Sequence, residues 1–460
     1  MAIHLMDMVI FGQIFGSDEA KAIFDEKGVV ESWLMFEGTL ANVQAELGII
    51  PKEAGEEISS KARVENLSLE KIAHYFQETS LVSVALLKAL KDICSKDAGE
   101  YIHYGPTTQD LYDTSLAMRL NRFMPLLIKD LETVRDLLLE LAARHKKTLM
   151  IGRTHGRQAI PITFGFKMAV SAETFNAHVK RAREIYPRVT VGSLSGAVGT
   201  FASFKGISEI NPLEIERMVM ERLGLNSPLI PAQPSIERFC EFLNFISLIS
   251  VSVEKMAQDI FTLQRDEIGE VKESAAKSTE ISSSTMPHKQ NPKGCEFIMG
   301  LTKLIRSNAR ALMEASMKDE RDRSAFWVED IAVPEACVLT STTLKTLKGI
   351  LENLEVFPDV MRKNIGLSKG LIMTENLMIE LSKKTGRKVS AHALISRLVS
   401  QAVKEDTPFD KVLLENEQLS EHLSTQQIED ALDPDKYIGL AEEMVERVLK
   451  SCGRSSEEKP

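Results

Sequence analysis

The stretch MPLLIKDLETVRDLLLELAARHKK, residues 124–147, decides the fold class. Its apolar side chains recur at alternating spacings of four and three, at Leu127, Leu131, Val134, Leu138 and Leu141. This spacing places them on one face of an α-helix and is typical of the seam of a helical bundle. The stretch therefore predicts a long bundle helix, with Pro125 near its start, where proline is tolerated.

Two further stretches show the same periodicity. Residues 237–267 carry a seam through Phe242, Ile246, Ile249, Val253, Met256, Ile260 and Leu263, and residues 298–313 carry one through Ile298, Leu301, Ile305 and Leu312. No comparable stretch of the sequence alternates with period two or has hairpin turn chemistry. We therefore predict an all-α protein with a central bundle of long helices. Phe245, Leu248 and Val251 lie off the second seam and indicate oligomerisation.

The length of 460 residues predicts several domains. We expect an N-terminal helical domain at 1–108, a central long-helix domain at 109–357 and a C-terminal helical domain at 358–460. Hydrophobic residues make up 43% and charged residues 27%, as in soluble globular proteins. The apolar runs are too short for a transmembrane helix, and the N-terminus lacks the basic region of a signal peptide.

Charge and cysteine content narrow the partners and the compartment. The net charge of −10 argues against a nucleic-acid-binding protein. The five cysteines, at 94, 240, 295, 337 and 452, show no C-x-x-C spacing, which argues against zinc sites and disulfides. We therefore expect a cytoplasmic protein without a membrane or nucleic-acid partner.

Four polar segments interrupt the helical pattern: HYGPTTQD (103–110), GRTHGRQAIP (152–161), GSLSGAVGT (192–200) and ISSSTMPHKQNPKGCE (281–296). Each has a plainer interpretation alone: a helix N-cap, a structural histidine, a tight helix junction and a linker. Together they offer hydroxyl and amide donors with Arg153, His155 and Lys289. That set suits a carboxylated small molecule, and no metal-ligand spacing or phosphate-binding loop accompanies it.

The last segment carries a family resemblance. SSSTMPHKQNP (282–292) resembles the G-S-S-x-M-P-x-K-x-N-P signature of the fumarase/aspartase superfamily. HYGPTTQDLYDT and GRTHGRQAIPITFG resemble its other two blocks in the same order, and SGAVGTFA and MRKNIGLSKGLI add support. The opening IFDEKGVVESWLMFEGTLANVQAELGIIP resembles the branch of adenylosuccinate lyases and 3-carboxy-cis,cis-muconate cycloisomerases.

The resemblance implies an all-α, three-domain homotetramer whose active sites are shared between subunits and need no cofactor. It implies β-elimination from a succinyl compound with release of fumarate. The catalytic residues carried over are Ser283 as base, His155 near the leaving group, Lys289 as carboxylate binder and Glu296 as the carboxylate that orients His155. A serine can act as a base only where donors stabilise its alkoxide in a closed site.

The resemblance also implies a set of substrate-binding residues. Thr107, Thr108 and Gln109 match a hydroxyl–hydroxyl–amide trio, and Asn291 and Gln233 match a carboxylate binder and a glutamine. Three neighbours within the matching blocks complete the contacts to substrate: Thr154, Ser284 and Met286. Near the leaving group we expect Arg321 and Ser324, together with Leu81 and Trp327.

Several positions depart from the branch. Ser282 replaces the signature glycine, and Leu81 stands where adenylosuccinate lyases have a second histidine. Their arginine-containing run S-A-E-R is WVED here, which ends at Asp330. These departures argue against adenylosuccinate itself, whereas His155 is unexpected in a cycloisomerase. The leading hypothesis is a lyase that breaks a C–N bond, in preference to C–O. The alternatives are a carboxymuconate-type cycloisomerase and a catalytically silent helical scaffold.

Overall fold

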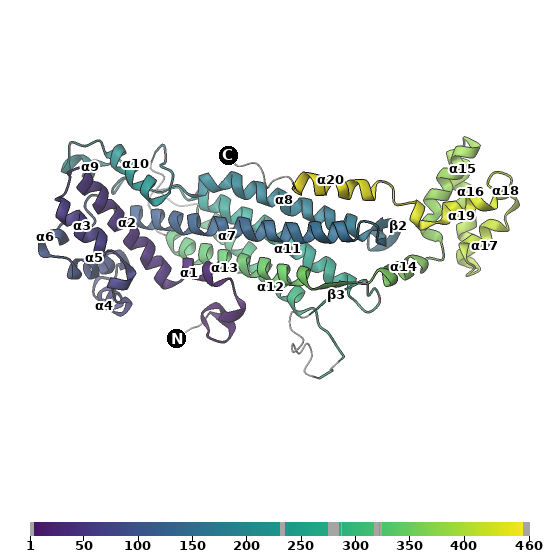
Figure 1. The fold of residues 1–460 in the computed structure, drawn as a ribbon, viewed down its shortest axis with the longest axis horizontal. Coiled ribbons are helices and arrows are strands. Elements are labelled where there is room, and N and C mark those ends of the chain that lie inside the picture. Colours follow the sequence, from purple (N-terminus) through teal and green to yellow (C-terminus); the bar gives the residue numbers. More distant parts are fainter. Residues whose placement is uncertain are drawn as a thin grey trace. The chain divides into compact units, whose positions relative to one another are not determined.

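The computed structural model describes residues 4–230, 235–274, 285–286, 288–316, 322 and 324–453. Helices make up most of these residues (Figure 1), which confirms the all-α prediction. The chain divides into two compact units: Met1–Leu131, His178–Val253 and Gly300–Lys345 form unit 1, and Glu132–Ala177, Glu254–Met299 and Thr346–Pro460 form unit 2. The predicted division into three domains stays a prediction. Among the described residues, no helix has the length and apolar character that a membrane crossing requires.

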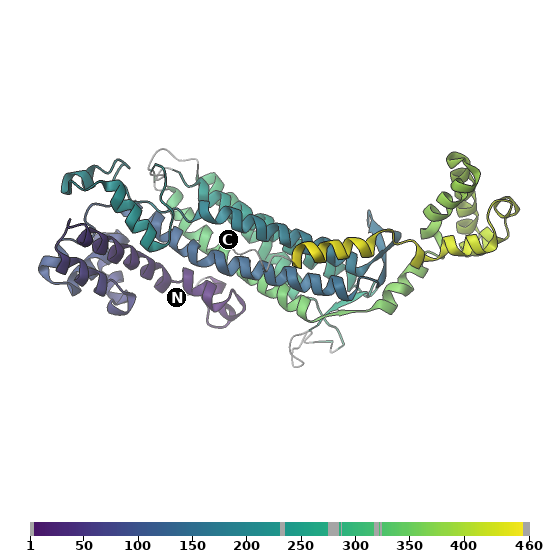
Figure 2. The ribbon, with the colours of Figure 1, turned by 45° about the horizontal axis from the view of Figure 1, so that its top comes forward.

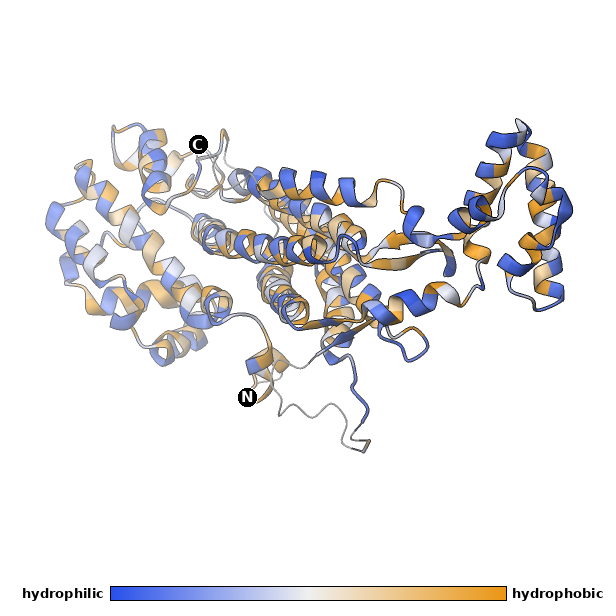
Figure 3. Ribbon diagram, turned by 45° about the vertical axis from the view of Figure 1, so that its right-hand side comes forward, coloured by the Kyte–Doolittle hydropathy of each residue, from blue (hydrophilic) through white to orange (hydrophobic). Residues whose placement is uncertain are grey.

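Five long helices contribute residues to both units: α7 (Thr108–Arg144), α8 (Phe164–Val189), α11 (Glu237–Leu263), α12 (Lys293–Ala315) and α13 (Ser324–Glu352). Every residue of the three predicted seams is at most 9% exposed. Blue and orange stripes along the helices in Figure 3 show the amphipathic pattern that places these residues inside.

Helix α7 begins earlier than predicted, at Thr108, so that Pro125 lies inside it. A proline cannot donate to the carbonyl four residues before it, which here belongs to Asn121. The hydroxyl of Tyr186 donates to that carbonyl at 3.1 Å instead. The helix therefore continues through the proline without leaving this acceptor unpaired.

Unit 1 also contains the short helices at the start of the chain and two after α8. Their bounds are α1 Asp18–Phe24, α2 Glu26–Glu46, α3 Lys52–Lys61, α4 Leu69–Thr79, α5 Val82–Ile93, α6 Lys96–Gly99, α9 Ala202–Ile207 and α10 Pro212–Leu223, with 3-10 turns η1 Leu5–Asp7, η2 Phe11–Ile14 and η3 Val64–Asn66. Helices α2 to α6 share one buried core, to which α2 contributes Leu34, Phe36 and Leu40. The N-cap Asp25 starts α2 by accepting from the Gly28 amide.

Unit 2 holds the C-terminal helices. Their bounds are α14 Pro358–Gly366, α15 Thr374–Thr385, α16 Lys388–Lys404, α17 Phe409–Leu414, α18 Glu417–Ser420, α19 Thr425–Leu432 and α20 Ala441–Gly453, with 3-10 turns η4 Leu371–Met373 and η5 Pro434–Lys436. Helices α15 to α19 stay together in the two views of Figures 1 and 2 and share a core that includes Leu377, Leu394 and Phe409.

Unit 2 also contains strands. β1 (Leu149–Thr154) and β2 (Arg157–Thr163) form an antiparallel hairpin, and β3 (Val271–Glu273) pairs with β4 (Leu354–Val356). The expectation that the chain has no hairpin turn was therefore wrong. The turn is His155–Gly156, where histidine rather than the usual asparagine takes the first left-handed position, and an irregularity at Gly152 interrupts the alternation.

Candidate active site

The predicted substrate-binding trio lies at the start of α7 in unit 1. The Thr107 amide donates to the side chain of Asp110 at 3.0 Å. The Thr108 hydroxyl lies 3.3 Å from that of Ser83, and the side-chain amide of Gln109 donates to the Asp113 carboxylate at 2.5 Å. The structure therefore brings Thr107, Thr108 and Gln109 together as one helix start with defined side-chain partners.

Asp110 fastens this helix start to the polar loop at 192–200. Its carboxylate, which is 0% exposed, accepts from the Ser193 hydroxyl at 3.2 Å, the Ser195 amide at 3.1 Å and the Gly196 amide at 2.9 Å. A buried charge needs such donors to offset its lost hydration. Two of the four predicted polar segments are therefore joined by a single buried carboxylate.

Two further ionisable groups surround this junction. His103 accepts or donates a 2.7 Å hydrogen bond with buried Glu37, according to its tautomer. Burial lowers the pKa of His103, but the charge and hydrogen bond of Glu37 and the charge of Asp110 outweigh it, so the pKa is raised. Burial, with a contribution from Asp110, raises the pKa of Glu216 to about 7.

The second predicted block forms the β1–β2 hairpin of unit 2. Thr154 ends β1, and His155 and Gly156 form the two-residue turn with φ of 51° and 72°. The left-handed conformation is uncommon for residues other than glycine, although asparagine, aspartate and histidine tolerate it. The turn exposes Thr154 and His155 to solvent. The hairpin therefore presents the predicted catalytic histidine at its tip.

An ion pair with a buried carboxylate holds this hairpin next to its turn. Arg153 donates to both oxygens of Glu270, at 2.9 and 2.7 Å, and Glu270 is 0% exposed. Asn364 of α14 donates to the same carboxylate at 2.9 Å, and Gln158 of β2 donates to the Asn364 carbonyl at 3.1 Å. The bidentate geometry fixes orientation as well as distance. It thereby locks the hairpin to the segment that leads into β3 and to α14.

The signature segment is described only in part. Ser283, Ser284, Gln233 and Arg321 lie outside the described residues. Met286 and Lys289 are exposed, and the Lys289 amide donates to the Met286 carbonyl.

Asn291 and Glu296 lie at the start of α12. Asn291 is half-buried, and Glu296 is exposed in the first turn of the helix. No hydrogen bond or ion pair between described residues joins Glu296 to His155, although both belong to unit 2. The contact expected between them is therefore absent from this part of the single chain.

The positions expected near the leaving group lie in unit 1. Ser324 begins α13, and its amide donates to Asp322. Trp327 is exposed, and Leu81 is the half-buried N-cap of α5. Asp330 lies 3.8 Å from the buried guanidinium of Arg119. The acidic residue that departs from the adenylosuccinate lyase pattern therefore has a cationic neighbour within the chain.

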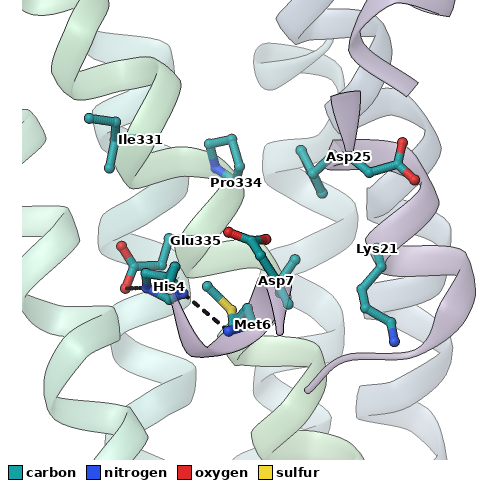
Figure 4. A pocket seen from close by; sticks show the side chains of 10 residues that line it. His4, Met6, Asp7, Lys21, Asp25, Ile331, Pro334 and Glu335 are labelled. Carbon is teal, nitrogen blue, oxygen red and sulfur yellow. Dashed lines mark hydrogen bonds and ion pairs between the residues drawn. The ribbon is translucent and has the colours of Figure 1, made fainter. Parts of the chain in front are cut away.

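Two cavities differ in their relation to these residues. One of about 370 Å³ in unit 2 is lined by Arg153 and Gly156 of the hairpin and by Lys167, Lys255 and Asp259. The other, of about 440 Å³ in unit 1, lies between the N-terminal segment and α13, where His4 pairs with Glu335 (Figure 4). No predicted site residue lines the second cavity, whereas the first borders the His155 turn.

Sequence reasoning did not identify the buried partners of the site. Asp110 ends a polar motif that reads as a helix N-cap, and Glu270 lies in the charged run DEIGEVKE, which resembles a solvated surface. Asn364 lies in a helix far along the chain. Only the presence of Asp110 inside a motif gave a local signal for any of them.

Both family models that this chain matches, and two of its curated relatives, are named as lyases. Residues 15–306 match the family model described as Lyase, and residues 370–448 match that of the adenylosuccinate lyase C-terminus. The chain is 38% identical over 452 residues to N-acetyl-S-(2-succino)cysteine lyase of Dickeya dadantii, with 98% of each chain covered. It is 36% identical over 456 residues to adenylosuccinate lyase of Methanocaldococcus jannaschii, covering 98% of this chain and 96% of the other.

A solved structure shares the fold. The 3-carboxy-cis,cis-muconate lactonizing enzyme from Pseudomonas putida superposes with a TM-score of 0.89 at 29% identity, covering 97% of this chain and 99% of the other. The matches extend over nearly the whole chain and include the regions that carry all three blocks. The chain is therefore an enzyme of the fumarase/aspartase superfamily of lyases, in the branch that contains adenylosuccinate lyases and carboxymuconate cycloisomerases.

Proposed function

We propose that this enzyme eliminates fumarate from a succinyl-type substrate by breaking a C–N bond. The observation that carries the elimination is the chemistry shared by its relatives, and the C–N bond is proposed from the adenylosuccinate lyases among them. Adenylosuccinate lyase and N-acetyl-S-(2-succino)cysteine lyase act, by their names, on compounds with different leaving groups but a common succinyl part. The succinyl part supplies the two carboxylates that Lys289 and Asn291, with the trio at 107–109, would bind.

In the proposed mechanism, Ser283 removes a proton from the carbon next to one carboxylate. The electron pair forms the double bond of fumarate, and the bond from the neighbouring carbon to the leaving nitrogen breaks. An acid, for which we propose His155 oriented by Glu296, returns a proton to that nitrogen. Donors held in a closed site stabilise the charge that develops on the carboxylate.

We further propose that the working enzyme is a cytoplasmic homotetramer with active sites shared between subunits. Two features support this assembly. His155 and Glu296 are both exposed, and no hydrogen bond or ion pair joins them among the described residues. Leu248 and Val251 of α11 are more than half exposed despite being apolar. Sedimentation should give a tetramer, and a fully active monomer would refute the shared site.

The substrate is tested with a panel of purified compounds. Fumarate formation is followed at 240 nm with adenylosuccinate, N-succinyl amines and N-acetyl-S-(2-succino)cysteine, and 3-carboxy-cis,cis-muconate is assayed in parallel. Fumarate from an N-succinyl compound supports the proposal. Turnover of the sulfur compound alone would move the broken bond to C–S, and turnover of carboxymuconate without any fumarate would establish the cycloisomerase alternative.

The catalytic roles are tested by two variants of the active enzyme. Ser283→Ala should reduce turnover at least about 100-fold, the lower range for loss of a general base, and retained activity above that level would remove Ser283 from this role. In His155→Asn the new side chain also tolerates the left-handed turn. A loss of activity in this variant therefore measures the contribution of the imidazole. That loss should be largest with poor leaving groups, and an equal loss with all of them would contradict the acid role.

A further inference from the structure

Glu273 connects the two chain segments that flank the signature loop. It is the last residue of β3, and its carboxylate accepts from the Gly294 amide at 2.8 Å and from the Cys295 amide at 3.1 Å. These amides belong to the first turn of α12, which begins at Lys293. A single side chain therefore ties the strand before the loop to the helix after it.

The chemistry of a helix start explains why a carboxylate suits this position. The first amides of an α-helix have no acceptor within the helix, and the helix dipole favours a negative charge beside them. Glu273 uses one oxygen for each of two such amides. Gly294 permits this approach, because a Cβ at that position would lie 2.9 Å from Glu273 Oε1 and 3.0 Å from Ile350 Cδ1.

Glu273 is itself fixed from two directions. In the β3–β4 ribbon it lies opposite Leu354. Its own amide donates to the side-chain oxygen of Gln264 at 2.8 Å. The carboxylate therefore extends from a backbone that the ribbon and Gln264 hold in place, and it can impose a position on α12 rather than merely follow it.

We propose that Glu273 is a positioning residue of the active site, which sets the first turn of α12 and thereby places Asn291 and Glu296. Asn291 lies three residues before Gly294 and Glu296 two residues after it, and the Glu296 amide closes the first helical turn onto the Pro292 carbonyl at 3.0 Å. This inference rests on the proposed function, because it assigns a consequence for turnover to those two residues.

The central experiment compares Glu273→Gln with Glu355→Gln. Glu355 lies on the paired strand and makes an exposed ion pair with Lys272, so its substitution removes the same charge from the same ribbon without touching α12. Displacement of catalytic groups by about 1 Å can cost on the order of 100-fold in rate. With adenylosuccinate or N-acetyl-S-(2-succino)cysteine as substrate, we expect kcat to fall roughly 10- to 100-fold in Glu273→Gln, and KM to rise as well, because Asn291 is a proposed carboxylate binder. Glu355→Gln should stay within about twofold of the wild type.

A second measurement does not depend on turnover. Hydrogen exchange of the peptide containing residues 293–297 should become faster in Glu273→Gln and not in Glu355→Gln, because Gly294 and Cys295 donate to Glu273. Unchanged exchange there would overturn the anchor. Faster exchange with kcat within about twofold of wild type would overturn its effect on catalysis.

The variants separate this inference from the proposed function and from general destabilisation. General destabilisation lowers apparent kcat with every substrate and speeds amide exchange in peptides throughout the protein, whereas loss of the Glu273 contacts speeds exchange selectively at residues 293–297. If Glu273→Gln does not fold, Glu273→Asp, which keeps the charge on a shorter side chain, is judged by the same two criteria. A wild-type enzyme that forms no fumarate from any compound contradicts the proposed function, whereas an active wild type with an equally active Glu273→Gln contradicts only the inference.

Discussion

Asp110 in unit 1 and Glu270 in unit 2 are both fully buried carboxylates. Each holds one of the predicted active-site blocks in place, but through different partners. Asp110 accepts from backbone amides and hydroxyls of the 192–200 loop, and also from the Thr107 amide of its own block. Glu270 pairs with the guanidinium of Arg153, which lies in the hairpin that carries His155. Loss of the first therefore leaves neutral donors without acceptors, and loss of the second leaves a partly buried cation without its counterion.

Asp110→Ala should have the largest effect on stability. It removes the acceptor of three backbone amides, and each buried donor left unsatisfied costs about 1–3 kcal/mol. We expect the free energy of unfolding to fall by about 4 kcal/mol or more, with loss of turnover because Thr107 to Gln109 lose their support. Urea denaturation measures the first effect. Asp110→Asn keeps one acceptor oxygen and should lose less, so equal losses in the two variants would contradict this account.

Glu270→Gln should destabilise the protein by about 3 kcal/mol, because breaking one partner of a buried ion pair costs about 3–5 kcal/mol. The lower value is expected because the Arg153 side chain is 23% exposed. Arg362→Ala is the control within the same unit. Its pair with Asp435 is exposed on both sides, and such pairs contribute less than about 1 kcal/mol. Similar losses in the two variants would show that burial does not distinguish these ion pairs.

The two blocks also differ in how far the sequence could predict them. The helical seams were predictable because burial of one helix face requires a periodic pattern. The seam residues between Leu127 and Leu141 and between Phe242 and Leu263 are indeed buried. The polar motifs were visible as interruptions of that pattern. The hairpin was not, because His155–Gly156 uses a left-handed histidine in place of the usual turn residues.

The supporting contacts could not be predicted for a more general reason. Glu270 meets Arg153 across 117 positions, and Asn364 across 94. No local periodicity or turn preference records which distant side chain will neutralise a given charge. The resemblance located His155 and Glu296 and implied an active site shared between subunits, but it did not indicate which buried side chains hold each block in place.

Glu216 is another buried carboxylate of unit 1. Unlike Asp110, it has an oxygen, Oε1, without a hydrogen-bond partner among the described residues. Burial, and then the charge of Asp110, raises its pKa to about 7. The unfolded chain ionises this group near its usual value of 4.5, so the folded state loses relative stability as pH rises from about 4.5 to 7. The accumulated loss is up to about 3 kcal/mol, at about 1.4 kcal/mol per pKa unit.

Glu216→Gln removes this titration. At pH 8 the variant should therefore be more stable than the wild type, and near pH 4.5 the two should unfold at similar urea concentrations. Urea denaturation at the two pH values gives the comparison. A variant that is less stable than the wild type at pH 8 would show that the ionised carboxylate is stabilised by its surroundings.

The smallest expected effect is a difference between the two units in how their stability depends on pH. His103 in unit 1 has a raised pKa, because the charge and hydrogen bond of Glu37 and the charge of Asp110 outweigh the opposing effect of burial. Its contribution to stability is therefore fully present below the unfolded pKa of about 6.5 and is lost as pH rises through the folded pKa. The Arg153–Glu270 pair contains no imidazole, so the support of the His155 hairpin should persist.

Glu37→Gln tests this difference through the pH dependence of urea denaturation. Between pH 6 and pH 9 the wild type should lose more stability than the variant, because only the wild type holds His103 in its charged form beside a carboxylate. Glu270→Gln, measured as the control, should lose a constant amount relative to wild type over the same range. A constant difference for Glu37→Gln as well would mean that His103 does not change its charge there, and that both blocks rest on supports insensitive to pH.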